Sequence, residues 1–272
     1  MRKINELIRK VMIAIIIAGA VFVMLGVTFN LVFRTISYSF YKNAVPFDKT
    51  DEYVKKFTIG DKQKLTGYER NNNKDSPKKA VIFFGGSSDI AYNAALKYGP
   101  LFENYTFFCI DYPGIQDSDG QMNLKSMNES ATKLYDYVSE LDYVDDDNIY
   151  VIGYSFGTGI ATYLASERMC KKLVVIGAYP DVTELYNQII PIFHSPLGWF
   201  VTDNIDAKEY AKSVDEEVLI VVSNDDKSIN SKVQKSMANY FSNKKIAEFE
   251  GVDHEKYFDN EAVVDRILDF IK

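Results

Sequence analysis

The sequence predicts an α/β fold with a mostly parallel, doubly wound sheet, preceded by one N-terminal transmembrane helix. Three observations support this prediction. Short apolar runs alternate with helical patterns after residue 51, which is typical of parallel strands joined by crossover helices. One of these runs leads into a serine turn flanked by glycines, residues 153–157. Ahead of all of them, Val11 to Phe33 contains no charged side chain.

The uncharged run is long enough to cross a membrane as a helix. At about 1.5 Å per residue it spans a hydrocarbon core of about 30 Å. A cleaved signal peptide is the main alternative, but the run is longer than a usual signal segment and no small-x-small cleavage site follows it. Basic residues concentrate before the run, which predicts a cytoplasmic N-terminus and an extracytoplasmic body. These residues are Arg2, Lys3, Arg9 and Lys10.

The same patterns divide the chain into three parts. We expect a cytoplasmic tail and transmembrane anchor over residues 1–36 and a linker over 37–51. The folded α/β domain then occupies residues 52–272, with a lid insertion at about 179–212.

Residues 153–157, Gly-Tyr-Ser-Phe-Gly, fit the G-x-S-x-G pattern of a nucleophile elbow. The elbow requires a strand before it and a helix after it, because the turn lifts the serine hydroxyl clear of the sheet edge. Residues 148–152 are apolar enough for a short buried strand, and residues 158–166 favour a helix. Glycine on both sides avoids a collision across the tight turn. We therefore predict that Ser155 is a catalytic nucleophile.

The chain contains two histidines, so the choice of a catalytic base is narrow. In the chain order that accompanies this elbow, the acid and then the histidine follow the serine on loops after later strands. His254 follows an apolar run and precedes the last helical pattern, as the base should. His194 lies in an aromatic, proline-containing stretch without a strand before it. We predict His254 as the base and His194 as a lid or core residue.

The acid should follow the apolar strand at residues 218–222, where two aspartates compete. Asp226 is preferred because Ile229, three positions further on, matches the usual spacing after the acid. Asp225 is the alternative, and the other aspartate of the pair is then a turn or helix-capping residue.

Two backbone N–H groups are expected to form an oxyanion hole. One belongs to Phe156, directly after the nucleophile. The other should come from the glycine-containing loop after the strand at residues 80–84, where Ser87 is the best candidate. Glycines in that loop allow the backbone to approach a substrate closely.

The segment between residues 179 and 212 is unusually long for a connection between strands. Its apolar residues predict a lid over the serine, in which Phe193, Trp199 and Phe200 contact substrate. Packing of these side chains in the protein core is the alternative.

Several sequence blocks together resemble the α/β-hydrolase-fold serine hydrolases, most closely the membrane-anchored abhydrolase-domain type. The resemblance covers roughly residues 50–272 and implies the α/β-hydrolase fold. The chain departs from many members at Gly85-Gly86, where they carry His-Gly. The blocks are Phe83-Phe84-Gly85-Gly86, Asp111-Tyr112-Pro113-Gly114 and Gly153 to Gly159.

Composition narrows the remaining function classes. The net charge of −7 and the absence of a basic stripe argue against a nucleic-acid partner. The two cysteines, Cys109 and Cys170, are isolated, and together with the scattered histidines they give no zinc motif. We therefore expect no metal and no cofactor.

The leading functional prediction is a membrane-anchored serine hydrolase that cleaves an ester or thioester of a small acyl or lipid-like substrate through an acyl-enzyme. A serine peptidase on the same triad is one alternative. A non-catalytic binding module with the same fold is another, although it has no need of all three triad residues.

Overall fold

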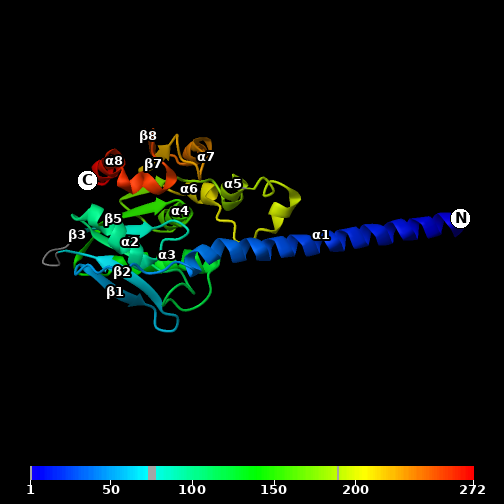
Figure 1. The fold of residues 1–272 in the computed structure, drawn as a ribbon, viewed down its shortest axis with the longest axis horizontal. Helices are drawn as coiled ribbons and strands as arrows, with labels where there is room; N and C mark the ends of the chain where they lie inside the picture. The colour runs from blue at the N-terminus through cyan, green and yellow to red at the C-terminus, as the bar shows by residue number, and fades with distance from the viewer. Residues whose placement is uncertain (1, 73–77, 189) are drawn as a thin grey trace.

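The structure, a computed structural model, describes residues 2–72, 78–188 and 190–272. Within these residues the centre of the molecule is an eight-stranded sheet with the order β1-β2-β4-β3-β5-β6-β7-β8 (Figure 1). The pairs β1–β2 and β2–β4 are antiparallel, and all later pairs in this order are parallel. The predicted α/β class with a mostly parallel sheet is thus confirmed. The strands are β1 Val54–Ile59, β2 Leu65–Arg70, β3 Lys78–Phe84, β4 Thr106–Ile110, β5 Val144–Tyr154, β6 Lys172–Ile176, β7 Val218–Ser223 and β8 Lys244–Phe249.

Helices cover both faces of the sheet, as the doubly wound prediction requires. Successive residues of β3 alternate between the two faces, with Ile82 in one hydrophobic cluster and Val81 and Phe83 in the other. The first cluster also contains buried residues of α3, α4 and α7, and the second contains those of α2 and α8. The helices are α1 Arg2–Lys42, α2 Ala91–Lys97, α3 Leu124–Ser139, α4 Gly157–Glu167, α5 Val182–Asn187, α6 Ala207–Ala211, α7 Ser231–Met237 and α8 Glu261–Ile271, with 3₁₀ helices η1 Gly99–Phe102, η2 Pro196–Phe200, η3 Ala238–Tyr240 and η4 His254–Asp259.

The central strands read as continuous apolar runs because both of their faces are covered. All six residues of β7 are buried, as are all five of β4. The parallel pairing of β5, β6, β7 and β8 places their carboxyl ends along one edge of the sheet, and the loops after β5, β7 and β8 carry the candidate site.

Helix α1 projects from the body as a long rod (Figure 1). It is long and apolar enough to cross a membrane, with a mean hydropathy of 2.7 in its most apolar window. The helix continues to Lys42, so the first part of the expected linker at residues 37–51 is helical instead. The physical reason is packing, because Tyr38 and Tyr41 are buried against the body. The Tyr38 hydroxyl also donates a hydrogen bond of 2.6 Å to Asp203.

The segment at residues 179–212, between β6 and β7, folds into α5, η2 and α6. We refer to it as the lid segment. Its aromatic residues pack against α1: the ring of Phe193 lies 5.3 Å from those of Phe29 and Phe33, and the ring of Phe200 lies 5.5 Å from that of Phe22. The lid segment therefore packs against the part of α1 that leaves the body.

Candidate active site

Ser155 occupies the turn between β5 and α4 in a backbone conformation that is unusual for a side-chain-bearing residue. Its φ angle is +51°, in the left-handed region. A Cβ atom on Gly153 would lie 2.6 Å from the Cα of Thr158, and one on Gly157 would lie 2.2 Å from the carbonyl oxygen of Phe84. Only glycine fits at these two positions, so the sequence pattern follows directly from the tightness of the turn.

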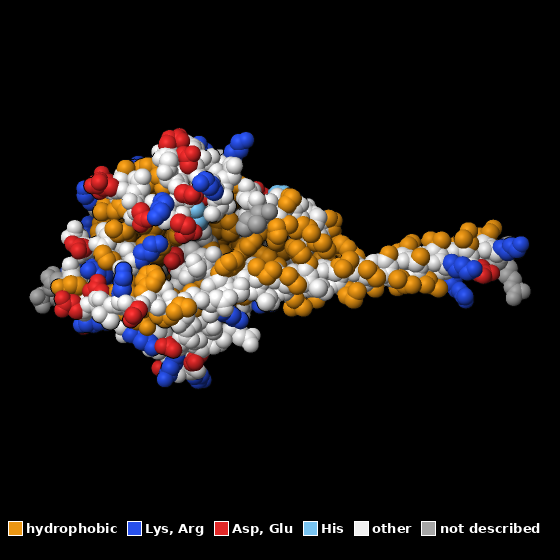
Figure 2. Space-filling model, viewed as in Figure 1, with side chains coloured by type: hydrophobic (Ala, Val, Ile, Leu, Met, Phe, Trp, Pro, Cys, Tyr) orange, Lys and Arg blue, Asp and Glu red, His pale blue; other side chains and the backbone are white. Residues whose placement is uncertain are grey.

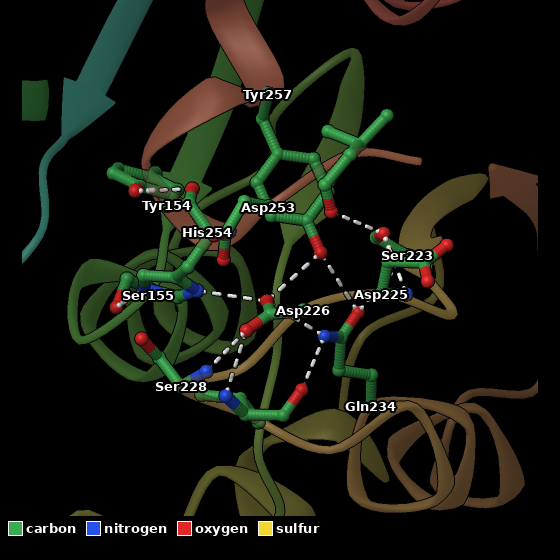
Figure 3. Close-up of polar contacts among 12 residues, drawn as sticks. Tyr154, Ser155, Ser223, Asp225, Asp226, Ser228, Gln234, Asp253, His254 and Tyr257 are labelled. Atoms are coloured by element: carbon green, nitrogen blue, oxygen red, sulfur yellow. Dashed lines mark hydrogen bonds and ion pairs between the residues drawn. The ribbon is translucent and has the colours of Figure 1, made fainter. Parts of the chain in front are cut away.

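Two hydrogen bonds connect the serine to a histidine and the histidine to an aspartate (Figure 3). His254 Nε2 lies 2.8 Å from Ser155 Oγ, and His254 Nδ1 lies 2.7 Å from Asp226 Oδ2. His254 begins η4 after β8, and Asp226 follows β7, so the sheet brings together residues that are far apart in sequence. His254 and Asp226 are both buried, which limits the motion of the pair.

A network of donors fixes the carboxylate of Asp226. Its Oδ1 accepts hydrogen bonds of 2.8 Å from the backbone N–H groups of Ser228 and Ile229. Its Oδ2 accepts from Gln234 Nε2 at 2.9 Å and from the Tyr257 hydroxyl at 3.0 Å (Figure 3). Sequence reasoning missed Gln234 and Tyr257, since neither belongs to a motif and only the fold brings them to the aspartate.

Tyr154 gives the loop that carries His254 a further support. The Tyr154 hydroxyl donates a 2.8 Å hydrogen bond to the backbone carbonyl of His254, and the two rings lie 5.3 Å apart. Burial raises the pKa of this tyrosine well above its usual range, so its hydroxyl remains a donor at neutral pH. Tyr154 therefore helps to hold the loop that carries His254.

Asp225 and His194, the sequence alternatives to Asp226 and His254, both lie outside this hydrogen-bonded set. Asp225 Oδ2 accepts a 2.6 Å hydrogen bond from the N–H of Gly251, so this side chain connects the two loops and does not contact the imidazole. His194 is in the lid segment, where its Nε2 lies 2.8 Å from the Glu184 carboxylate and its side chain is 56% exposed.

The two expected oxyanion donors both border the space in front of Ser155. Within the described chain, the N–H groups of Ser87 and Phe156 donate no hydrogen bond, so both are free to bind a substrate oxygen. The Ser87 loop is tied down next to them, because the N–H of Gly86 donates a 2.8 Å hydrogen bond to Asp89. A Cβ atom on Gly86 would lie 3.5 Å from that of Ser155, which shows how closely the loop approaches the elbow.

A cavity of about 200 Å³ opens in front of Ser155 and His254. Its apolar wall comes from Phe40 of α1 and from Leu185 and Tyr186 at α5. A larger, more open groove of about 740 Å³ between α1 and α3 contains neither Ser155 nor His254, so we place the candidate site in the smaller cavity.

The sequence predicted substrate contacts for Phe193, Trp199 and Phe200. None of the three borders the cavity at Ser155. Phe193 and Phe200 pack against α1, and Trp199 is 81% exposed. Apolar composition alone could not distinguish packing on α1 from packing on a substrate.

Among the residues that the structure describes, one cluster of three carboxylates is compact enough to share a cation. The carboxylates of Asp145, Asp146 and Asp147 are within 4.8 Å of one another. They lie near the start of β5, at the opposite end of this strand from Ser155. The candidate site itself therefore consists of a serine, a histidine, an aspartate and backbone donors.

Comparison with known proteins places this site in a family context. Residues 83–203 match the family described as the alpha/beta hydrolase fold. The zebrafish (Danio rerio) lysophosphatidylserine lipase ABHD12 is 27% identical over 128 residues, which cover 42% of this chain and 32% of that lipase. The chain thus aligns with about a third of the length of this relative.

Solved structures of esterases share the same fold. The Pyrococcus furiosus esterase Pf2001 superposes with a TM-score of 0.67 at 16% identity, over 84% of this chain and 94% of that chain. Acetyl xylan esterase 1 from Thermoanaerobacterium sp. JW/SL YS485 gives a TM-score of 0.65 at 17% identity, over 84% and 86%.

The fold and these matches define the class of protein. The chain has the α/β-hydrolase fold, and its sequence matches are to proteins of the abhydrolase-domain type. The relatives named above are esterases and a lipase.

Proposed function

We propose that the chain is a membrane-anchored serine hydrolase that cleaves an ester or thioester of an acyl substrate. The observation that carries this proposal is the continuous hydrogen-bonded series from Asp226 through His254 to Ser155. It ends at a strained elbow that faces a cavity. Serine, base and orienting acid within hydrogen-bond reach are the elements that activate a serine hydroxyl for covalent catalysis.

In the proposed mechanism, Ser155 Oγ attacks the substrate carbonyl carbon while His254 Nε2 accepts the hydroxyl proton. The carbonyl π electrons move to oxygen, and the N–H groups of Ser87 and Phe156 stabilise the resulting oxyanion. When the tetrahedral intermediate collapses, the bond to the alcohol or thiol breaks and His254 donates the proton to this leaving group. An acyl-enzyme remains, in which Ser155 Oγ carries the acyl group.

Deacylation repeats these steps with water. His254 removes a proton from water as the water oxygen attacks the acyl carbonyl, and the second tetrahedral intermediate expels Ser155. The serine regains its proton from His254, and the acid product leaves. Throughout, Asp226 accepts the Nδ1–H hydrogen bond and stabilises the imidazolium.

We further propose that α1 is the membrane anchor, with the N-terminus in the cytoplasm and the hydrolase domain outside. The basic residues before the uncharged run support this orientation. The match to a lysophosphatidylserine lipase supports an acyl lipid as substrate. Protease added to intact cells should digest the body, and complete protection without permeabilisation would refute this orientation.

A substrate panel tests the proposed reaction. The full-length protein in detergent micelles is assayed with p-nitrophenyl esters of graded chain length, an acyl thioester and a peptide amide. We expect hydrolysis of the esters or the thioester, abolished by Ser155→Ala and retained by Ser166→Ala, a control on helix α4, which follows the Ser155 turn. Cleavage of the amide alone would favour a peptidase, and no turnover at all would favour a binding module.

A further inference from the structure

We propose that the lid segment and the facing part of α1 form one apolar surface that inserts into the bilayer, so that Ser155 receives its lipid substrate directly from the membrane. This inference rests on the proposed function and adds the source of the substrate: an acyl lipid resident in the leaflet next to the body. The occupant of the surface is therefore lipid.

The first argument is the position of the lid contacts along α1. Phe22, Phe29 and Phe33 contact the lid segment and lie at helical spacing on one face. A Cβ atom on Gly26 would lie 2.3 Å from the ring of Phe200, so the two segments approach closely there. From Phe22 to Phe33 the helix rises by about 16 Å at about 1.5 Å per residue. All these positions lie inside the uncharged run, and a bilayer that surrounds the run also surrounds the lid residues that contact it.

A polarity gradient runs along the same interface. The aromatic contacts near Phe22 are followed, toward the body, by hydrogen bonds of 3.2 Å between Asn30 and Thr202. One helical turn further, Arg34 forms a 2.8 Å ion pair with Asp203. Charged groups belong at or beyond the membrane interface, because burying them in hydrocarbon is costly. The gradient thus places the Arg34 ion pair at the bilayer surface and the contact with Phe22 below it.

The second argument is the exposed apolar surface around this interface. Trp199 at the tip of the lid segment is 81% exposed, and Ile190 is 56% exposed. The neighbouring side chains of α1 include Leu25 and Leu31, each more than half exposed. In Figure 2 the hydrophobic side chains form an almost continuous surface from α1 onto the adjoining part of the body, and charged side chains gather on the rest of the visible face. Large apolar patches of this kind mark membrane contacts, and tryptophan is enriched at bilayer interfaces.

The third argument connects this surface to the catalytic cavity. Tyr186, which lines the cavity at Ser155, has its ring 4.9 Å from that of Phe33 and 5.8 Å from that of Phe193. Phe40 of α1 borders the same cavity. The cavity of about 200 Å³ is smaller than most ligand sites, which measure about 300–1,000 Å³. A long acyl chain must therefore extend beyond it, and the apolar surface of the lid segment and α1 adjoins it.

Trp199 makes the insertion directly measurable, because it is the only tryptophan in the chain. The full-length protein is reconstituted into phosphatidylcholine vesicles and its tryptophan fluorescence is recorded with doxyl-labelled phosphatidylcholine or with aqueous acrylamide. We expect strong quenching by the doxyl lipids and several-fold weaker quenching by acrylamide than for free tryptophan. Full acrylamide quenching without doxyl quenching would overturn the proposal.

The delivery of substrate is tested by the ratio of two rates: hydrolysis of a long-chain monoacylglycerol in vesicles, divided by hydrolysis of water-soluble p-nitrophenyl acetate. Trp199→Glu should lower this ratio about tenfold. Met169→Glu is the matched control, since Met169 is 85% exposed but follows α4, outside the lid segment, and it should leave the ratio unchanged.

An equal ratio in all three proteins would overturn delivery from the membrane. If the wild-type protein hydrolyses neither these esters nor the esters and thioester of the substrate panel, the proposed function fails and delivery fails with it, whereas the fluorescence measurement still decides the insertion. The two failures are thus distinguishable.

Discussion

The ring of Tyr41, next to the last residue of α1, meets the ring of Phe156, directly after Ser155, with centroids 5.9 Å apart. Tyr41 is 2% exposed and also packs edge-on against Tyr112. The end of the candidate membrane helix is therefore part of the wall that holds the elbow in place. The helix is both a candidate tether and a structural element of the candidate site.

Replacement of Tyr41 by alanine should therefore affect both stability and activity. Removal of a buried aromatic ring costs roughly 3–5 kcal/mol of unfolding free energy, and the loss of support for Phe156 should also lower kcat/KM. Tyr41→Phe keeps the ring contacts and should remain close to wild type. Thermal unfolding in detergent micelles and ester hydrolysis measure the two effects. Wild-type stability and activity of Tyr41→Ala would contradict this role.

The two histidines should differ sharply in their importance. His254→Ala removes the proposed base and should lower kcat by about a thousandfold or more. His194→Ala removes an exposed lid residue paired with Glu184 and should leave kcat within a few-fold of wild type. Both rates are compared on the same soluble ester. A larger loss at His194 would overturn the proposed site.

The two neighbouring aspartates offer a matched pair of conservative variants. Asp226→Asn places an amide against His254 Nδ1 and should lower kcat by roughly a thousandfold or more, because the imidazole loses its orienting carboxylate. Asp225→Asn affects only the contact with Gly251 and should be much milder. Steady-state kinetics on one ester separate the two, and the opposite order would assign the acid role to Asp225.

Asp111 should make the stability of the protein depend on pH. Burial raises the pKa of this carboxyl to about 7, against an ordinary value of about 4. Between these values the folded state retains a proton that the unfolded state releases, so the free energy of unfolding falls as pH rises from about 4 to about 7. Three pKa units correspond to about 4 kcal/mol.

Asp111→Asn removes this titration and keeps the oxygen that accepts the hydrogen bond from Ala91. The difference in unfolding free energy, variant minus wild type, should therefore be larger at pH 8 than at pH 5. The increase should be up to a few kcal/mol. Urea unfolding at the two pH values measures the difference. If wild type and variant differ in unfolding free energy by the same amount at pH 5 and at pH 8, Asp111 does not titrate in this range.

The sequence predicted those parts of the fold and site that depend on local rules. The strand, turn and helix around Ser155 follow from glycine at two crowded positions, and chain order then points to His254 and Asp226. Phe40 was missed because it lies in the expected linker, and only tertiary packing brings this part of α1 to the cavity. The expected linker was partly helical for the same reason: the burial of Tyr38 and Tyr41 depends on tertiary packing.

For the lid segment, too, the sequence could not identify the contact partners of its aromatic side chains. The aromatic content of residues 179–212 indicated an apolar contact, but the partner of Phe193 and Phe200 is α1 and not the substrate cavity. Gln234 and Tyr257 support the proposed acid from positions that no motif marks. Such contacts arise only when loops after β7 and β8 come together in three dimensions.

The central claim is that Ser155 is a nucleophile activated by His254. Labelling with a fluorophosphonate probe tests it most directly, because the probe forms a covalent bond with an activated serine. The full-length wild-type protein in membranes should label, Ser155→Ala should not label although it remains folded, and Ser166→Ala should label like wild type. Full labelling of Ser155→Ala, or no labelling of a folded wild-type protein, would contradict the account.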